Sequence, residues 1–313
     1  MDAIRCQSLT KRYGDVIALD SLNLTLEEGS VFGFLGPNGA GKTTTLRLLT
    51  GLGIPTSGQA WIAGDEVKRG SFALRRKIGY LPEEPAFYTW MTGREFLYYV
   101  GELFGLPSAE NRERCDEILG LVELRQNAKR KIGGYSRGMR QRLGIAQALM
   151  NQPQVLFLDE PCSALDPMGR RDVLNLIQRL RRQTTIFMST HILSDAERVC
   201  DRVGIIDHGR LIIQSSIEEL REKYARSTFE IQFEEDASPI IPTLEALPWV
   251  ARVEQTVINE VPLLRLQASD LNTARQELPK VVASSGLALS RYELTLPTLE
   301  DIFVDLVGNG SAQ

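Results

Sequence analysis

The chain has 313 residues, of which 43% are hydrophobic and 24% are charged, the balance of an ordinary globular protein with length for about two domains. The net charge of −4 argues against a general nucleic-acid binder, and four scattered cysteines argue against a disulfide framework or a metal knuckle. No apolar run approaches the ~18 residues of a membrane helix. We therefore expect a cytoplasmic protein, which can still dock on a membrane protein.

Charge is distributed unevenly along the chain. Residues 226–313 contain six Lys and Arg against thirteen Asp and Glu, a net charge of −7, which leaves +3 for the first 225 residues. This asymmetry predicts two bodies with different roles, a first domain over residues 1–225 and a second over 226–313.

The first part of the chain alternates strands with glycine-containing turns. Residues 8–30 contain short β-prone pieces separated by Gly and Asp. The apolar run at 31–36 is typical of a buried parallel strand, and the residues from 43 onward have the apolar spacing of a helix. Helical patterns also occupy residues 91–120.

Two more apolar runs, 155–159 and 184–190, alternate with helical patterns at 168–182 and 192–200, and residues 203–214 form a predicted hairpin. Strands alternating with helices predict an α/β fold with a largely parallel, doubly wound sheet. A charged helix near 215–227 then closes this body. The rest follows the order β-α-β-β-α-β, the split βαβ arrangement of a small α+β domain, and ends in a helix at 298–307.

The stretch GPNGAGKTT, residues 36–44, matches the phosphate-loop pattern in the strand-loop-helix context which that pattern requires. Lys42 can reach the β- and γ-phosphates of a nucleotide, the Thr43 hydroxyl can ligate Mg²⁺, and Thr44 can add a phosphate contact. Its glycines allow the backbone to approach phosphates closely. The alternative is a glycine turn that only precedes a helix. The loop residues predicted to bind nucleotide are Gly36, Pro37, Asn38, Gly39, Ala40 and Gly41.

A second acidic element follows the apolar run VLFLD. Asp159 ends this predicted strand, at the sheet edge beside the phosphate loop, where it can hold Mg²⁺ through water. Glu160 follows directly and can polarise an attacking water. The alternative is a buried strand that ends in two solvated acids. Further upstream, Ser136 and Gly138 open a helix, and taken alone they indicate only a capped helix.

Tyr135-Ser136-Arg137-Gly138-Met139, followed by Gln141-Arg142, resembles the signature motif of ATP-binding-cassette (ABC) ATPases, and its Ser136 lies 23 residues before Asp159. The resemblance covers residues 1 to about 225 and rests on six motifs in order. It implies that Tyr13 stacks on adenine, that Ser163-Ala164-Leu165-Asp166 is the loop after the catalytic Glu160, and that the histidine of STHIL, His191, contacts the γ-phosphate. Glu83 stands where this family usually has a metal-sensing glutamine.

The resemblance implies a P-loop NTPase (RecA-like) core with an antiparallel β-subdomain and a helical subdomain at about 85–150. It also implies that ATP and Mg²⁺ bind between two subunits in a head-to-tail dimer, where Ser136 and Gly138 of one subunit cap the ATP held by the other. The residues that it implies in catalysis are Lys42, Glu160 and His191. Those that it implies in binding or sensing Mg²⁺ are Thr43, Asp159 and Glu83. A separate integral-membrane permease would dock on the helical subdomain, which places the chain at the cytoplasmic face of the membrane.

The second domain resembles the accessory domain that follows many export-type ABC ATPases, because residues 297–303 read PTLEDIF. We therefore expect the ATPase subunit of an exporter. Three alternatives remain open: an importer ATPase, a soluble ABC ATPase that acts on ribosomes or DNA, and a binding module without turnover. The cargo, the choice between homodimer and heterodimer, and the role of the accessory domain are not determined by the sequence.

Overall fold

The computed structural model describes residues 2–163, 165–181, 183–224, 227–258, 261–295 and 297–308. The chain forms two compact units, Met1–Ile217 and Glu218–Gln313. The division falls at the start of helix α8 (Ile217–Lys223), so the charged helix that was expected to close the first body lies almost wholly in the second unit. The expected boundary between residues 225 and 226 lies outside the described residues. Among the described helices, none has the length and apolar character to span a bilayer.

The first unit is built on a six-stranded sheet in the order β10-β9-β3-β8-β7-β6. The parallel strands are β3 (Val31–Leu35), β6 (Ile78–Leu81), β7 (Val155–Asp159), β8 (Thr185–Thr190) and β9 (Arg202–Asp207), and β10 (Arg210–Ser216) runs antiparallel to β9. Every residue of β3, β7 and β8 is buried, as expected of parallel strands that are covered on both faces. The predicted parallel α/β sheet is confirmed.

A second sheet of four strands, in the order β2-β1-β4-β5, supplies the antiparallel subdomain. It consists of β1 (Asp2–Tyr13), β2 (Val16–Glu27), β4 (Ser57–Ile62) and β5 (Asp65–Glu66), and helix α2 (Phe72–Lys77) follows it. Where short β-prone pieces were expected, β1 and β2 are continuous twelve-residue strands. Shifts in their pairing register absorb the irregular residues, so the ladder continues to the turn at Gly14 and Asp15.

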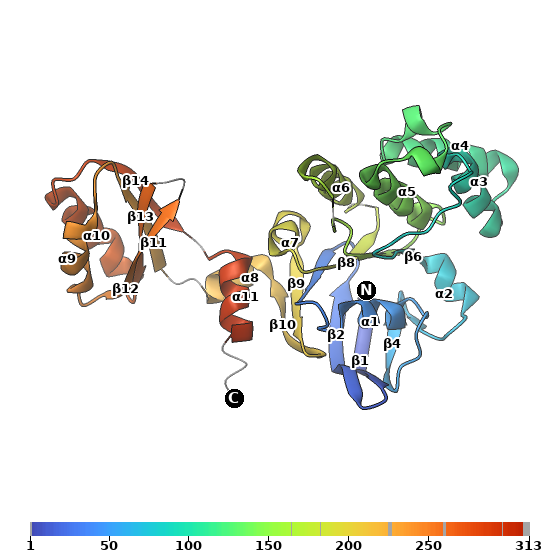
Figure 1. The fold of residues 1–313 in the computed structure, drawn as a ribbon. Helices are drawn as coiled ribbons and strands as arrows, with labels where there is room; N and C mark the ends of the chain where they lie inside the picture. The colour runs from blue at the N-terminus through green and yellow to red at the C-terminus, as the bar shows by residue number, and fades with distance from the viewer. Residues whose placement is uncertain are drawn as a thin grey trace. The chain divides into compact units, whose positions relative to one another are not determined.

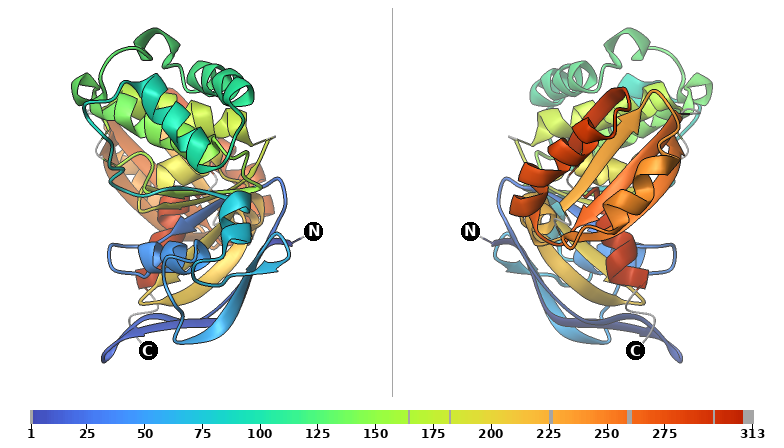
Figure 2. Two further views of the ribbon diagram at one scale, coloured as in Figure 1. Left: turned by 90° about the vertical axis from the view of Figure 1, so that its right-hand side faces the viewer. Right: turned by 90° about the vertical axis from the view of Figure 1, so that its left-hand side faces the viewer.

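Helices form the layers on the two faces of the central sheet. They are α1 (Lys42–Leu49), α3 (Gly93–Leu103), α4 (Ser108–Leu121), α5 (Arg137–Leu149), α6 (Pro167–Leu180) and α7 (Leu193–Val199), with short 3-10 turns η1 (Arg125–Asn127) and η2 (Ile132–Gly134). Figures 1 and 2 show α3, α4 and α5 at one end of this unit and β1, β2 and β4 at the other. The sequence favours these helix starts: Thr92 and Glu95 form a reciprocal capping box at α3, and Asp166 with Pro167 opens α6.

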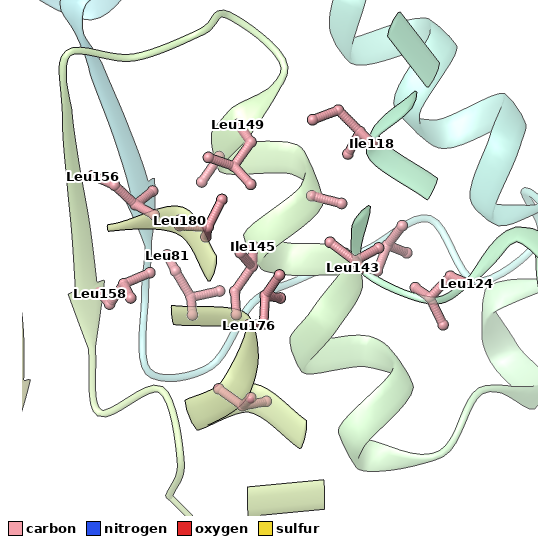
Figure 3. Close-up of a cluster of buried hydrophobic side chains, with 14 of the residues drawn as sticks. Leu81, Ile118, Leu124, Leu143, Ile145, Leu149, Leu156, Leu158, Leu176 and Leu180 are labelled. Carbon is pink, nitrogen blue, oxygen red and sulfur yellow. The ribbon is translucent and has the colours of Figure 1, made fainter. Parts of the chain in front are cut away.

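Strand β7 separates two hydrophobic cores because successive side chains of a strand point to opposite faces. Val155 and Phe157 enter the core shared with the antiparallel sheet and α1, whereas Leu156 and Leu158 enter the core of α3–α6. Figure 3 shows the latter core, where the two leucines lie near Ile145 of α5 and Leu176 and Leu180 of α6. Each buried leucine contributes about 1.5–3 kcal/mol, so this packing anchors the end of β7 that carries Asp159.

The second unit contains a four-stranded antiparallel sheet in the order β12-β13-β11-β14. Its elements are β11 (Ser227–Phe233), η3 (Ser238–Ile240), α9 (Ile241–Glu245), β12 (Val250–Ile258), β13 (Val261–Ala268), α10 (Leu271–Ser284), β14 (Leu289–Thr295) and α11 (Leu299–Gly308). The predicted β-α-β-β-α-β order is confirmed. Phe229 and Phe233 pack with residues of α9 and α10, which cover one face of the sheet (Figure 2, right), and Glu230 on the other face pairs with Arg265 and Arg291.

Candidate functional site

The phosphate-loop pattern lies between the end of β3 and the start of α1, and two of its glycines are required by their surroundings. A Cβ atom on Gly36 would lie 2.3 Å from the Ile206 carbonyl oxygen, and one on Gly41 would lie 2.4 Å from that of Ala18. Gly41 also has a φ of 108°, which side-chain-bearing residues rarely adopt. The loop backbone is therefore held against β2 and β9 in a conformation that only glycine permits.

Helix α1 begins at Lys42 without a side-chain cap and without an acidic residue in its first turn. The N-terminal N–H groups of a helix lack partners inside the helix and carry the positive end of its dipole. An uncapped helix start next to a glycine-rich loop is therefore suited to a phosphate group.

The Lys42 ammonium group is buried at the centre of the site. It donates to the carbonyl oxygens of Gly36 at 2.8 Å and Pro37 at 3.2 Å, and it lies 3.4 Å from Glu160 Oε1. These contacts hold a positive charge between the loop and the acids at the end of β7.

Asp159 ends β7 and accepts two hydroxyl hydrogen bonds on the same oxygen. Thr43 Oγ1 donates to Asp159 Oδ1 at 3.3 Å, and Ser189 Oγ donates to it at 2.5 Å. Burial raises the pKa of the Asp159 carboxyl above its usual range, although the two hydroxyl donors act in the opposite direction. A carboxylate and a hydroxyl oxygen thus converge beside the phosphate loop, and these are the hard oxygen ligands that suit Mg²⁺.

Glu160 lies between a cation and a histidine. Its Oε1 faces Lys42, and its Oε2 lies 3.0 Å from Nδ1 of His191, which follows β8. The backbone of Glu160 has a φ of 48°, in the left-handed region. This geometry turns the buried carboxylate toward the loop, where it can orient a water molecule next to a bound phosphate.

The remaining predicted residues lie apart from this cluster. Tyr13 ends β1 with an exposed ring, and Lys11 Nζ lies 4.8 Å from its centroid. Ser136 caps α5 by accepting from the Met139 N–H at 3.2 Å, and Gly138 lies in the first turn of α5. In the described part of this chain, none of the three contacts the Lys42 cluster, by which we mean Lys42, Thr43, Asp159, Glu160 and His191.

Glu83 lies in the exposed segment after β6, and the described contacts do not join it to Thr43 or Asp159. Glu83 still acts electrostatically on Tyr80 of β6. Burial raises the pKa of Tyr80 to about 12, and the negative charges of Asp159 and Glu83 act in the same direction.

Among the described residues, no three His, Cys, Asp or Glu side chains form a metal-binding group. In the predicted loop after Glu160, Ala164 lies outside the described residues.

Sequence reasoning missed Ser189, which contacts both acids. Ser189 follows three apolar residues near the end of β8, but a serine at that place indicates a site residue only once its neighbour in the sheet is known. Parallel strands end at the same edge of a sheet, and Ser189 is the residue of β8 paired with Asp159 of β7.

Comparison with known proteins gives consistent matches to both units. Residues 19–163 match the family model described as ABC transporter, and residues 216–307 match the one described as the C-terminal domain of DrrA1-3-like ATP-binding proteins. An uncharacterised ABC transporter ATP-binding protein of Bacillus subtilis is 39% identical and covers 96% of this chain and 98% of its own length. A bacitracin transport ATP-binding protein of Bacillus licheniformis is 35% identical, with 98% of each covered. A daunorubicin resistance ATP-binding protein of Streptomyces coeruleorubidus is 34% identical over 98% of this chain and 96% of its own.

Solved structures with a similar fold are also ABC cassettes. A subunit of the cbiONQ ABC transporter complex of Clostridium perfringens has a TM-score of 0.65 at 27% identity, over 71% of this chain and 94% of its own. A dimeric post-hydrolysis cassette bound to ADP and phosphate has a TM-score of 0.62 at 26% identity, over 68% of this chain and 98% of its own.

Proposed function

The chain belongs to the ATP-binding proteins of ABC transporters and hydrolyses ATP to power a separate membrane permease, and we propose that it serves an export system as a head-to-tail dimer. The observation that carries the catalytic part is the position of the Glu160 carboxylate between Lys42 and His191. Phosphoryl transfer to water depends mainly on positioning and on neutralising charge, and these three side chains supply both.

Each residue has a role in this proposal. Lys42 and the N–H groups of the loop bind the phosphates, Glu160 orients and deprotonates the attacking water, and His191 stabilises the γ-phosphate. The Thr43 hydroxyl and the Asp159 carboxylate fit Mg²⁺ and would hold it, directly or through water. When bound, Mg²⁺ neutralises negative charge on the phosphate oxygens. Glu83 would adjust the metal site from the segment after β6.

The dimer accounts for the residues that lie apart from the cluster. The start of α5, with Ser136 and Gly138, has no contact with the Lys42 cluster among the described residues. In a head-to-tail dimer the positive end of this helix would face ATP held by the partner subunit. Tyr13 offers an exposed ring on which adenine can stack. The dimeric relative bound to ADP and phosphate supports such an arrangement. A dimer with a related second ATPase would use the same residues.

The permease would dock on the helical subdomain, at the cytoplasmic face of the membrane. Tyr88 and Trp90 are exposed beside α3, and a neighbouring hollow of about 550 Å³ is lined by residues of α3 and α4, including Tyr98 and Tyr99. Exposed aromatic groups next to a hollow suit an apolar helix. The relatives act in bacitracin transport and daunorubicin resistance, which favours export over the importer, ribosome and DNA alternatives.

The test is ATP hydrolysis by the purified chain, wild type beside Glu160→Gln, with the oligomeric state measured by light scattering in Mg-ATP. We expect Glu160→Gln to lower kcat by about 100-fold or more and to accumulate as a dimer. Glu113→Gln, on the exposed side of α4, is the matched control and should hydrolyse ATP like wild type. If wild type binds ATP without dimerising or hydrolysing it, the homodimer is excluded. The chain then either needs a partner subunit or membrane component to complete its site, or is a binding module without turnover.

A further inference from the structure

Ser189 is the second-to-last residue of β8 and has 0% exposed surface. It lies in the sheet beside Asp159, the last residue of the neighbouring parallel strand. A buried hydroxyl at an apolar strand position needs partners, because an unpaired one costs about 1–3 kcal/mol. Both of its partners belong to the catalytic acids.

The hydroxyl group uses its donor and its acceptor on different residues. Ser189 Oγ donates its single proton to Asp159 Oδ1 at 2.5 Å. The same oxygen accepts from the backbone N–H of Glu160 at 3.2 Å, and the Ser189 carbonyl oxygen accepts from that N–H at 3.1 Å. A serine can make these bonds together, because its hydroxyl has one donor hydrogen and two acceptor lone pairs.

These bonds act where the backbone is strained. The left-handed φ of 48° at Glu160 costs about 1–2 kcal/mol for a residue other than glycine. It persists only where the surroundings enforce it. The shared N–H bond to Ser189 is the contact that holds the Glu160 amide in place, and the resulting turn directs the carboxylate toward Lys42 and His191.

From this geometry we infer that Ser189 is a positioning residue that sets the orientation of both acids, Asp159 through its side chain and Glu160 through its backbone. The inference rests on the proposed hydrolytic function. Ser189 does not touch the nucleotide in this proposal and acts only through its two neighbours. Its loss should therefore slow the chemical step while leaving ATP binding nearly unchanged.

The experiment compares Ser189→Ala, Ser189→Thr and Ser189→Cys in the full-length chain. For each, kcat and KM for ATP come from steady-state hydrolysis, and the affinity for nucleotide comes from titration with a fluorescent ATP analogue. We expect Ser189→Ala to lower kcat by about 10- to 100-fold, the range typical when a hydrogen-bond partner of a metal-binding carboxylate is removed. KM and analogue affinity should stay within about threefold. Ser189→Thr keeps the hydroxyl and should restore most of kcat.

Thr184→Ala is the matched control. Thr184 directly precedes β8, at the end of the strand opposite Ser189, is also buried, and donates to the Pro153 carbonyl oxygen at 2.8 Å, away from the acids. We expect this variant to lose thermal stability but to keep kcat within twofold. Ser189→Cys keeps a side-chain atom at the position of the hydroxyl oxygen and leaves no cavity, so it provides the measurement if the alanine variant does not fold. With only a weak S–H donor, it should also be slow.

The inference is overturned if Ser189→Ala, or Ser189→Cys in its place, hydrolyses ATP at the wild-type rate while Glu160→Gln is inactive. It is equally overturned if the threonine variant is as slow as alanine at full nucleotide affinity. These results would leave the ATPase function intact. The proposed function would instead be contradicted if the wild-type chain hydrolysed no ATP, either alone or together with each candidate partner.

Discussion

His191 Nδ1 lies 3.0 Å from Glu160 Oε2, which joins the segment after β8 to the segment after β7. The two residues are 31 positions apart in the chain and meet because β7 and β8 are adjacent parallel strands that end at the same edge. The contact gives the carboxylate a partner on the side opposite Lys42. It therefore orients the group that activates water in the proposed function, and it holds the imidazole beside that group.

Replacing His191 by alanine should lower kcat by about 100-fold or more, the size of effect seen when one group that stabilises transition-state charge is removed. The measurement is steady-state ATP hydrolysis. His208 is the other histidine of the chain and provides the control. Its side chain is 91% exposed in the β9–β10 turn and pairs with Asp207, so His208→Asn, which tolerates the positive φ there, should keep the wild-type rate. Equal rates for the two variants would contradict the role of His191.

Gly41→Ala should prevent nucleotide binding and destabilise the first unit. The new Cβ would lie 2.4 Å from the Ala18 carbonyl oxygen, at a φ of 108°. Strain of this kind costs about 1–3 kcal/mol. Gly29→Ala is the control, since Gly29 has a positive φ of 78° but a Cβ atom there would have no atom within 4 Å. Thermal unfolding and ATP titration should separate the two, and an unaffected ATP affinity in Gly41→Ala would refute the expected clash.

Arg170→Ala should destabilise the first unit by about 2–4 kcal/mol, toward the lower part of the range for breaking a buried ion pair, because Arg170 is partly exposed. Arg170 Nε of α6 lies 2.6 Å from the buried Asp195 carboxylate of α7, which would be left without its cation. Arg179 of α6 pairs with exposed Glu123 at 2.8 Å, so Arg179→Ala should cost about 1 kcal/mol or less. Urea unfolding measures both, and similar losses would rule out a special contribution from the buried pair.

Trp90→Ala should leave ATP hydrolysis by the isolated chain within twofold of wild type, because the indole is 67% exposed and lies outside the Lys42 cluster. It should weaken binding to the permease, since aromatic anchors contribute strongly to interfaces. Phe72→Ala, at an exposed aromatic residue of α2, is the control. Co-purification with the co-expressed permease is the readout, and retention of Trp90→Ala at the wild-type level would place the docking surface elsewhere.

The sequence by itself determined the elements and the loop. The phosphate-loop pattern lies in one continuous stretch, so its glycines, Lys42 and Thr43 were identifiable without tertiary information, as were the strand that ends at Asp159 and the β-α-β-β-α-β order of the second unit. Local propensity and periodicity carry this information because both depend on near neighbours in the chain.

Only the tertiary structure decided which of these residues meet. Ser189 was overlooked because a serine near the end of a strand has no meaning until the register of β8 against β7 places it beside Asp159. Lys42 and His191 lie against the two different carboxylate oxygens of Glu160. This arrangement likewise depends on strand order and on a left-handed backbone at Glu160, which no local pattern predicts. Pairing between distant strands is a property of the whole sheet, and for that reason the geometry of the site emerged only with the fold.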